Sequence, residues 1–506
     1  RQRLGEPFKL LSGGRRDAPA RQQTLRAAIQ WSHALLSPAE RSALRRLGVF
    51  PDSFSVVLAQ QMIGDPAPNP GDDSDWSALD LLQSLLDKSL LVHQVVPQVP
   101  AAGAAPRLRL LESTRIFAQE RLAEAGEVPL MRQRLAAAML KVFSREGGPF
   151  GAHLSVDEAA VCAPELDNLR EALDTLAAGA GQARMLVDLT GASAWIWSRL
   201  GLRSEGIRRC RQALARVDAN TPAPLEARLQ LAWVQLVHRR GADGDRAAAQ
   251  RAVALHEGLG DRQGRFRAVS LLAFMHALAM DEVACMAALD DMADSFDPDW
   301  GDMQWGAYHW TLCACLSQFS LWDEVNAISQ KGLAQAVKLG QEGWMAVGWI
   351  GMAQVSSGQG AYEKAVREAQ TGLASIRRLK LRGILGMALG DLATYLVEVG
   401  RVDEALPLAR EAVALRAVDG TLGTQLDQLA RLACARGRFQ EAALALGRAD
   451  AHHAHRHGQR ERYLRNPMQN TIATLATVFS AAELQALRAR GAAMGDDQVT
   501  QLTVSD

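Results

Sequence analysis

Hydrophobic residues recur along most of this chain at intervals of three and four positions, the spacing of amphipathic helices. Before residue 130 the pattern predicts five helices, over residues 24–36, 38–48, from about 55 to 63, 76–89 and 112–125. The second has a strong start signal, because Ser37 can cap it, Pro38 suits its first position and Glu40 suits its first turn. Gly126 is expected to end the fifth helix.

Two short apolar runs interrupt the helical pattern. Residues 90–96 and 107–111 are separated by a loop rich in Pro, Ala and Gly, an arrangement that predicts a β-hairpin. Helices, then a hairpin, then a helix within about a hundred residues are typical of a winged helix. We therefore predict a winged-helix domain over residues 21–126.

Beyond residue 200 the chain repeats itself. Pairs of amphipathic stretches meet at seven predicted turns, separated by 41, 36, 42, 40, 40 and 37 residues: Gly201, Ala242, Leu278, Ser320, Gly360, Gly400 and Gly437. The clearest copies are residues 360–365, 400–405 and 437–442. Such a period indicates an array of stacked helix pairs.

Small residues recur at fixed distances from these turns. Gly, Ala or Cys fills 16 of the 21 positions that lie 7 before, 5 after and 12 after each turn, against five to six expected from composition. Helices that pack closely need small residues where their backbones approach. The pattern resembles the tetratricopeptide repeat (TPR), whose period is shorter, so longer helices or loops are expected. The Leu278 copy is poor, with Leu271 and Asp290 at small positions.

Composition narrows the function classes. The chain has 506 residues, too many for one core, and 56 basic residues balance 56 acidic ones, which removes the simplest argument for nucleic-acid binding. No apolar run approaches the roughly 18 residues of a membrane helix. The six cysteines form no C-x-x-C pair and suit free thiols in a reducing cytoplasm. Because the first residue is Arg1, we expect a piece of a longer or processed product.

Four blocks of the first part resemble one known segment. It follows the nucleotide-binding core in bacterial STAND-type regulators, the signal-transducing ATPases with numerous domains. The blocks are residues 21–32, 44–50, 85–91 and 110–118. Residues 165–173 resemble the helix that comes next in that family, Glu205 and Gly206 the opening of its first repeat, and residues 491–495 its usual C-terminal end.

The resemblance implies the C-terminal half of an ATP-dependent transcriptional regulator. This sequence contains no G-x-x-x-x-G-K-[ST], so ATP or ADP is expected in a missing upstream ATPase domain and no cofactor in this chain. The expected fold is mainly α, a winged helix with a small β-hairpin followed by a TPR-like α-solenoid. The expected parts are a trailing ATPase segment (1–20), the winged helix (21–126), a connecting helical segment (127–200), about seven helix pairs (201–457) and a C-terminal cap and tail (458–506).

Aromatic residues concentrate in two adjacent repeats. By the repeat alignment, His309 and Trp349 occupy core positions. Four others are freer to line the concave groove and bind a ligand or peptide: Trp305, Tyr308, Trp310 and Trp344. They are the predicted site residues.

Other candidate chemistry is weaker. His452, His453, His455 and His457 do not share a helix face as metal ligands at i and i+4 do. No nucleophile elbow accompanies the serines and histidines, so no catalytic residue is expected and this chain is not expected to be an enzyme. Acidic pairs such as Asp290–Asp291 and Asp403–Glu404 are expected at repeat turns, where they would cap helices.

The expected partners follow from the resemblance. They are the chain's own upstream ATPase domain and a protein or small-molecule inducer in the repeat groove, with no membrane and a possible homo-oligomer on activation. DNA binding is expected only through a missing N-terminal domain, because the helix over 76–89 and its approach carry five Asp against Lys88 alone: Asp72, Asp73, Asp75, Asp80 and Asp87. The alternative is a stand-alone TPR-like scaffold without a nucleotide switch.

Overall fold

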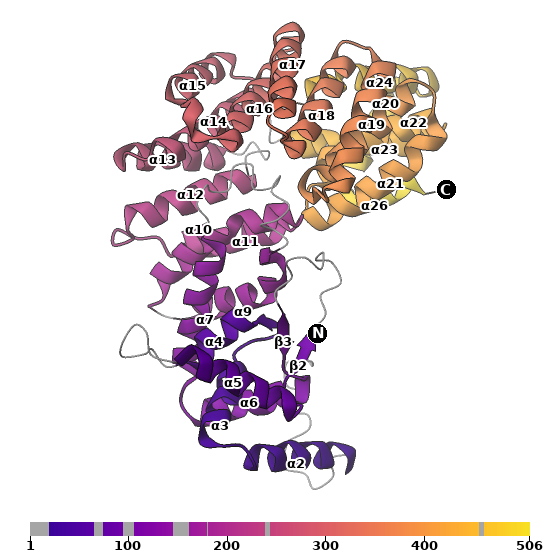
Figure 1. The fold of residues 1–506 in the computed structure, drawn as a ribbon. Coiled ribbons are helices and arrows are strands. Elements are labelled where there is room, and N and C mark those ends of the chain that lie inside the picture. The colour runs from indigo at the N-terminus through magenta and orange to yellow at the C-terminus, as the bar shows by residue number, and fades with distance from the viewer. Residues whose placement is uncertain are drawn as a thin grey trace. The chain divides into compact units, whose positions relative to one another are not determined.

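A computed structural model describes residues 20–64, 74–94, 106–144, 161–179, 181–237, 243–454 and 460–505. These residues form two compact units, each described here by itself (Figure 1). The first contains the described residues up to 143 together with 161–179, and the second contains those from 181 onward. Residues 127–200, predicted as a connecting segment, are therefore divided between the two units.

The first unit is mostly helical. Its described elements are α2 (Ala20–Ala34), α3 (Pro38–Leu47), β1 (Phe54–Ser55), α4 (Val56–Ile63), α5 (Ser74–Asp87), β2 (Val92–Gln94), β3 (Arg107–Arg109), α6 (Glu112–Glu124), α7 (Val128–Phe143), η2 (Ala163–Glu165) and α9 (Leu166–Ala178). The predicted start of α3 is confirmed, since the Ser37 side chain accepts from the Glu40 N–H and Glu40 accepts from the Ser37 N–H. Gly126 follows α6 with φ +70°, as its predicted role requires.

A small antiparallel sheet of order β1-β3-β2 lies among these helices. The predicted hairpin is confirmed: His93 of β2 pairs with Leu108 of β3. The other edge of β3 pairs with β1, where Phe54 lies opposite Leu108. This third strand was not predicted, because two residues are too few to show an alternating pattern.

A buried ion pair fastens the sheet to η2 and α9. The Arg107 guanidinium contacts the Glu165 carboxylate, and both side chains are almost fully buried. Arg107 also donates to the Ser53 carbonyl at 2.8 Å, and Asn168 donates to the same carbonyl at 3.0 Å and to Glu165 at 2.6 Å. These contacts give a structural role to Glu165 and Asn168, which belong to the 165–173 block.

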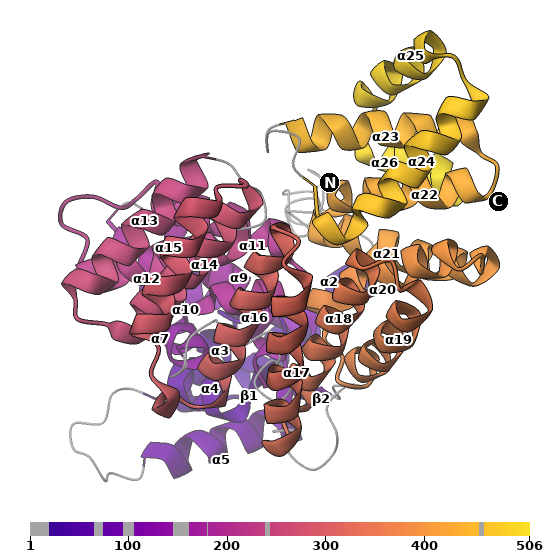
Figure 2. The ribbon, with the colours of Figure 1, turned by 90° about the horizontal axis from the view of Figure 1, so that it is seen from above.

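The second unit is a stack of helices (Figure 2). Its described elements are α10 (Ala183–Arg199), α11 (Arg203–Leu214), α12 (Ala223–Val237), α13 (Asp243–Gly258), α14 (Arg262–Leu278), α15 (Glu282–Ser295), η3 (Pro298–Trp300), α16 (Asp302–Gln318), α17 (Trp322–Lys338), α18 (Glu342–Gly358), α19 (Tyr362–Arg378), α20 (Arg382–Glu398), α21 (Val402–Asp419), η4 (Leu422–Gln425), α22 (Leu426–Ala435), α23 (Phe439–Ala454), η5 (Arg462–Leu464), α24 (Arg465–Val478), α25 (Ala481–Ala492) and α26 (Asp496–Val504). From α10 to α23 the described helices form seven successive pairs.

The 40-residue step comes from helix length. Helices α16 to α20 have 17 residues each, and three residues connect most neighbouring helices. In each tight connection one residue takes a left-handed conformation, as Ser320, Gly360 and Gly400 do at 40-residue intervals. At Gly360 the Ala361 N–H donates to the Ser356 carbonyl at 2.8 Å, closing the helix end. The repeat therefore differs from the shorter TPR period by its longer helices.

The predicted small positions are contact positions. In the copies around Gly360, Gly400 and Gly437 they are all buried: Ala353, Ala365, Gly372, Ala393, Ala405, Ala412, Ala430, Ala442 and Ala449. The turn placed at Leu278 is wrong by two residues, since Leu278 is a buried residue of α14 and Met280 is the left-handed residue. From Met280, the first two offsets fall on buried Ala273 and Cys285. Ala242 lies outside the described residues.

The first helix of each pair contacts the first helix of the next pair, so α10, α12, α14, α16, α18, α20 and α22 form a continuous layer. Beyond the pairs, α24, α25 and α26 cover α22 and α23 around a core that includes Leu475 and Val499. The crossing of α23 with α25 is close because Gly447 and Gly491 face the opposite backbone: a Cβ on either would overlap the other helix, at Arg488 O and Leu444 O.

Candidate functional site

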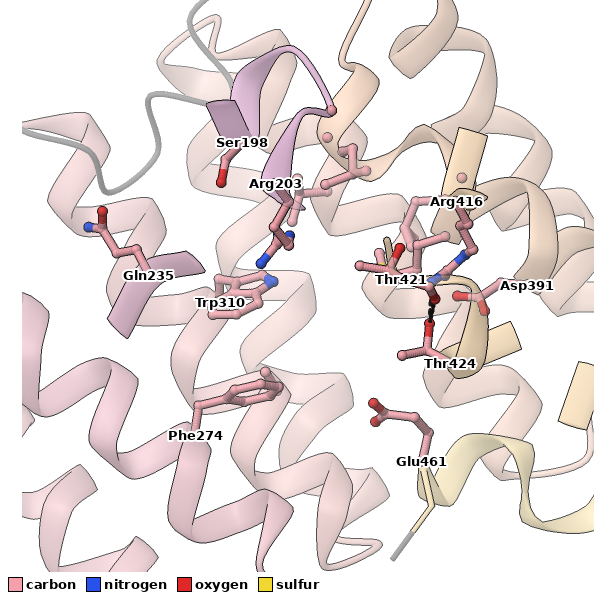
Figure 3. A pocket seen from close by; sticks show the side chains of 18 of the residues that line it. Ser198, Arg203, Gln235, Phe274, Trp310, Asp391, Arg416, Thr421, Thr424 and Glu461 are labelled. Atoms are coloured by element: carbon pink, nitrogen blue, oxygen red, sulfur yellow. Dashed lines mark hydrogen bonds between the residues drawn. The ribbon is translucent and has the colours of Figure 1, made fainter. Parts of the chain in front are cut away.

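A cavity of about 460 Å³ lies inside the second unit. Residues from all seven first helices, α10 to α22, contribute to its wall. Figure 3 shows part of the wall, including Ser198, Gln235, Phe274, Trp310 and Asp391 from five of these helices. Cavities of about 300–1,000 Å³ accommodate drug-sized molecules. The layer of first helices therefore borders a space large enough for an organic ligand.

Aromatic side chains form part of this wall. Trp310 of α16 packs on Phe274 of α14 with ring centroids 5.6 Å apart, and both line the cavity. Trp344 of α18 lines it as well. Two of the four predicted site residues, Trp310 and Trp344, thus come together here from neighbouring repeats.

The other two predicted residues do not contribute to the cavity wall. Trp305 packs on His309, with ring centroids 3.8 Å apart. Tyr308 stacks on Phe296 at 4.6 Å. Both are half-buried in contacts with other aromatic residues of the repeats.

The assignment of core tryptophans needs correction. Trp344, predicted to be free, is only 7% exposed, whereas Trp349 and His309, predicted as core residues, are half-buried. The reason lies on α16, where Gly306 leaves room for the Trp344 indole to pack against the backbone; a Cβ there would overlap the ring. Within the described structure, the Trp344 Nε1 is buried without a hydrogen-bond partner.

A buried carboxylate organises the polar part of the wall. Asp391 of α20 accepts hydrogen bonds from Gln354 at 3.0 Å, from Gln428 at 2.8 Å and from the Tyr463 hydroxyl at 3.2 Å. Burial raises the pKa of Asp391 above its ordinary value, although the hydrogen bonds and the charge of Arg416 act in the opposite direction. Asp391 therefore joins α18, α22 and η5 to one point of the cavity wall.

Arginine side chains gather along the cavity where α11, α20 and α21 meet it. Arg203, Arg382 and Arg416 all belong to its wall. Arg203 donates to the Leu236 carbonyl at 3.0 Å, Arg416 contacts the Thr424 hydroxyl, and Arg382 is exposed at the first position of α20. Nearby, burial lowers the pKa of Arg199 and the positive charge of Arg382 lowers it further, so positive charges crowd this side.

A C-terminal segment forms part of the cavity wall. We call residues 460–464 the strap. Glu461 accepts a hydrogen bond from Gln318 of α16 at 2.7 Å, and the Tyr463 carbonyl accepts one from Ser357 of α18 at 3.0 Å. Both strap residues line the cavity. The repeat pattern gave no sign of this segment, because Gln318 and Ser357 lie more than a hundred positions away and Asp391 lies 72 positions away.

The first and sixth helix pairs also meet. Arg199, at the end of α10, donates to the Lys380 carbonyl at 2.9 Å, and Lys380 precedes α20. Ser204 of α11 lies against Gly420, which follows α21 with φ +69°. These contacts close the stack of pairs around the cavity.

The clustered histidines and the cysteines were the other residues considered for chemistry. His452 lines the cavity, while His453 is buried with its Nε2 3.3 Å from Asp427 Oδ2; His455 and His457 lie outside the described residues. No group of three metal-ligating side chains occurs in the described part of the chain.

All six cysteines are free thiols, and burial raises the pKa of Cys210 to about 12.

The two acidic pairs differ in where they lie. Asp403 and Glu404 lie in the first turn of α21, as expected, but no side chain caps this helix and Glu404 pairs with Arg401 at 2.7 Å. Asp290 and Asp291 do not lie at a turn: they are in the body of α15, where Asp291 pairs with Arg265 at 2.8 Å.

The acidic face predicted to disfavour DNA is described only in part. Asp80 and Asp87 are exposed on α5, and the ammonium of Lys88 pairs with Glu40. Asp72 and Asp73 lie outside the described residues. No helix in the described ranges is both long and apolar enough to span a bilayer.

Comparisons with known proteins give partial likenesses. No family model matches the chain. A protein of Mycobacterium tuberculosis provisionally named an HTH-type transcriptional regulator is 42% identical over 125 residues, 24% of this chain and 13% of its own length. A Mycobacterium bovis protein of the same description gives the same values. An uncharacterized M. tuberculosis protein is 37% identical over 131 residues, 26% of this chain and 31% of its own.

Two solved structures resemble the fold weakly. A STAND protein with a tetratricopeptide repeat sensor from Pyrococcus horikoshii has a TM-score of 0.47 at 13% identity, covering 92% of this chain and 67% of that chain. A Rap protein in complex with competence and sporulation factor has a TM-score of 0.43 at 12% identity, covering 68% and 98%. Both scores are below 0.5, and nothing about this chain follows from them. The chain thus spans 13% of the length of the first regulators that it matches.

Proposed function

We propose that this chain is the sensor and autoregulatory half of a STAND-type, ATP-dependent transcriptional regulator. In this proposal the solenoid binds an inducer or partner in the cavity, and the first unit couples that event to an upstream ATPase domain. The observation that carries the proposal is the cavity, to whose wall every helix pair and the strap contribute residues. A ligand there contacts segments far apart in the sequence, so it can favour one arrangement of them over another.

The first unit supports the coupling role as a winged helix. Helices α3, α4 and α5, together with a sheet of order β1-β3-β2 that contains the β2–β3 hairpin, suit that fold. On α2, Trp31 is 68% exposed and Leu35 is 64% exposed. Large exposed apolar side chains of this kind mark interaction sites. We assign this face to the contact with the ATPase domain.

This winged helix is not assigned to DNA. A helix that enters the major groove needs basic or amide side chains toward the bases and phosphates. The exposed Asp80 and Asp87 of α5 would repel phosphates, and Lys88 is engaged with Glu40. DNA binding in the proposed regulator belongs to a separate N-terminal domain, in keeping with the partial identity to a provisionally named HTH-type regulator.

The decisive experiment recovers the reading frame upstream of Arg1 and expresses its full product. We expect a P-loop upstream, and we expect Trp31→Ser with Leu35→Ser to raise ATP turnover without inducer by weakening the autoinhibitory contact. The matched control is Val57→Ser, another apolar residue exposed in the same unit at 59%. A frame without a P-loop would overturn the proposal and favour the scaffold alternative.

A further inference from the structure

The charges on the cavity wall specify the ligand more closely than its size does. Three arginines, Arg203, Arg382 and Arg416, and two acidic residues, Asp391 and Glu461, line the cavity. Both carboxylates already accept hydrogen bonds from neutral side chains of the wall, three at Asp391 and one from Gln318 at Glu461. Counted by formal charge, the wall therefore has one positive charge in excess. Arg203 and Arg416 also hold the fold, through the Leu236 carbonyl and the Thr424 hydroxyl, whereas Arg382 is exposed.

The positive side coincides with the start of a helix that has no acid in its first turn. Helices α17, α18, α19 and α21 carry Asp or Glu there, whereas α20, like α10 and α14, has none and begins with Arg382. The first-turn residues Arg382, Gly383 and Ile384 all line the cavity. The partial positive charge of a helix N-terminus adds to that of the arginines and favours an anion.

Another part of the cavity wall is apolar and aromatic. Trp310, Phe274 and Trp344 present rings to the same cavity, and the Trp344 Nε1–H is a buried donor without a partner in the described structure. Figure 3 shows Arg203, Trp310 and Phe274 along one side of the space, with Arg416 across from them and Glu461 at its far end. A ligand that satisfies these groups has an apolar body and an anionic end.

We propose that the cavity binds an amphipathic organic monoanion, an aromatic or branched aliphatic carboxylate. The carboxylate lies toward Arg382, whose exposed guanidinium allows bidentate pairing, and the apolar body packs on Trp310 and Phe274. One negative charge neutralises the excess of the wall. This inference rests on the proposed sensor role of the same cavity and adds the chemical class of the inducer.

The test uses two dyes that differ only in an anionic group. The full chain is titrated with 8-anilinonaphthalene-1-sulfonate and with its neutral counterpart N-phenyl-1-naphthylamine, and bound dye is measured by fluorescence and by energy transfer from tryptophan. We expect the sulfonate to bind at one site at least tenfold more tightly. Indole-3-propionate should displace it, and tryptamine, which has the same ring with an ammonium group, should not.

Variants place the binding in the cavity. Arg382→Gln changes an exposed side chain and should weaken the sulfonate about tenfold while leaving the neutral dye unchanged, since one charge-assisted contact contributes about that factor. Arg208→Gln on α11, 53% exposed and absent from the cavity wall, is the control. Equal binding of the two dyes, displacement by tryptamine, or equal effects of both variants would overturn the inference.

The outcomes separate this inference from the proposed function. If only the neutral dye binds, the cavity is still a ligand site and the anionic class alone is wrong. If neither dye nor either indole binds, the sensing role of the cavity fails together with the inference. If the anions bind as expected but the upstream frame encodes no P-loop, the inference stands and the STAND assignment falls.

Discussion

The Tyr463 hydroxyl donates a hydrogen bond to Asp391 across 72 positions of sequence, at 3.2 Å. It is one of the contacts that hold the strap over the cavity, together with the Ser357–Tyr463 carbonyl bond and the Gln318–Glu461 bond. Because Asp391 also accepts from Gln354 and Gln428, the strap and two helix pairs share one buried carboxylate.

Removing the two ends of that bond should have unequal effects. Tyr463→Phe leaves Asp391 with two donors and should lower the free energy of unfolding by about 1 kcal/mol. Asp391→Leu leaves three donors without their acceptor and should cost about 3 kcal/mol or more. Urea denaturation followed by circular dichroism measures both. Equal effects would show that Asp391 is not the shared acceptor.

The crossing of α23 and α25 should tolerate no side chain. Gly447→Ala or Gly491→Ala forces the two backbones apart and should destabilise the protein by about 3 kcal/mol. Gly258→Ala is the matched control, because a Cβ on this α13 residue meets no atom within 4 Å. The control should be neutral or more stable by up to about 1 kcal/mol, as helix propensity favours alanine. Thermal unfolding of the three variants decides the matter.

Acid should weaken the first unit through Glu40. Hydrogen bonds from Lys88, Ser84 and Ser37 lower the pKa of Glu40 to about 2 from an ordinary value of 4.5. A carboxyl whose pKa is lower in the folded state stabilises it at neutral pH, and that stabilisation is lost as the pH falls from about 4.5 toward 2.

Glu40→Gln should therefore reduce the free energy of unfolding at pH 7 by about 1–3 kcal/mol. It should also weaken the fall of that free energy with decreasing pH, which we call the acid limb. Asp80→Asn, at an exposed position of α5, is the control and should leave the acid limb unchanged. Stability measured in denaturant from pH 7 to pH 2 tests this, and an unaltered acid limb in the Glu40 variant would contradict it.

The buried pair Arg107–Glu165 should behave asymmetrically. Glu165→Ala leaves a buried guanidinium without its carboxylate and should cost about 3–5 kcal/mol. Replacing both partners, as Arg107→Met with Glu165→Met, removes the unpaired charge and should cost less. Arg170→Met with Asp167→Met, an exposed pair on α9, is the control and should change stability by less than about 1 kcal/mol. A double variant as unstable as Glu165→Ala would contradict this reasoning.

The packing of the Trp344 indole against Gly306 can be tested by substitution. Gly306→Ala places a Cβ against the indole and should displace it, weakening sulfonate-dye binding and lowering the melting temperature. Gly351→Ala in α18 also lies at the cavity, but its Cβ meets only Ser329 Oγ at 3.9 Å. Dye titration and thermal unfolding of the two variants should differ clearly, and identical results would mean that the ring is not held by Gly306.

Local signals predicted much of the fold. The Ser37 capping box, the Gly126 stop and the turns at Gly360, Gly400 and Gly437 depend on neighbouring residues, so the sequence displays them directly. The turn at Met280 was missed because a methionine in a left-handed conformation carries no such signal. The small residues around it, Ala273 and Cys285, could have corrected the alignment.

The site was less accessible to prediction. Trp310 and Trp344 line the cavity, but the repeat alignment did not reveal that Gly306 makes room for Trp344. The charged groups Arg382, Asp391 and Glu461 were not singled out at all, because they lie in separate repeats and meet only through packing. The binding of a ligand or peptide by Trp305 and Tyr308 stays a prediction.

The contacts of Arg199 with Lys380 and of Ser204 with Gly420 also fix the number of repeats. An open solenoid can gain or lose an inner helix pair, because each pair interacts only with its neighbours. Here, deleting one 40-residue unit would move the first and sixth pairs out of register and leave both surfaces without their partners. The fold should therefore tolerate substitutions within a repeat far more readily than the insertion or deletion of a whole repeat.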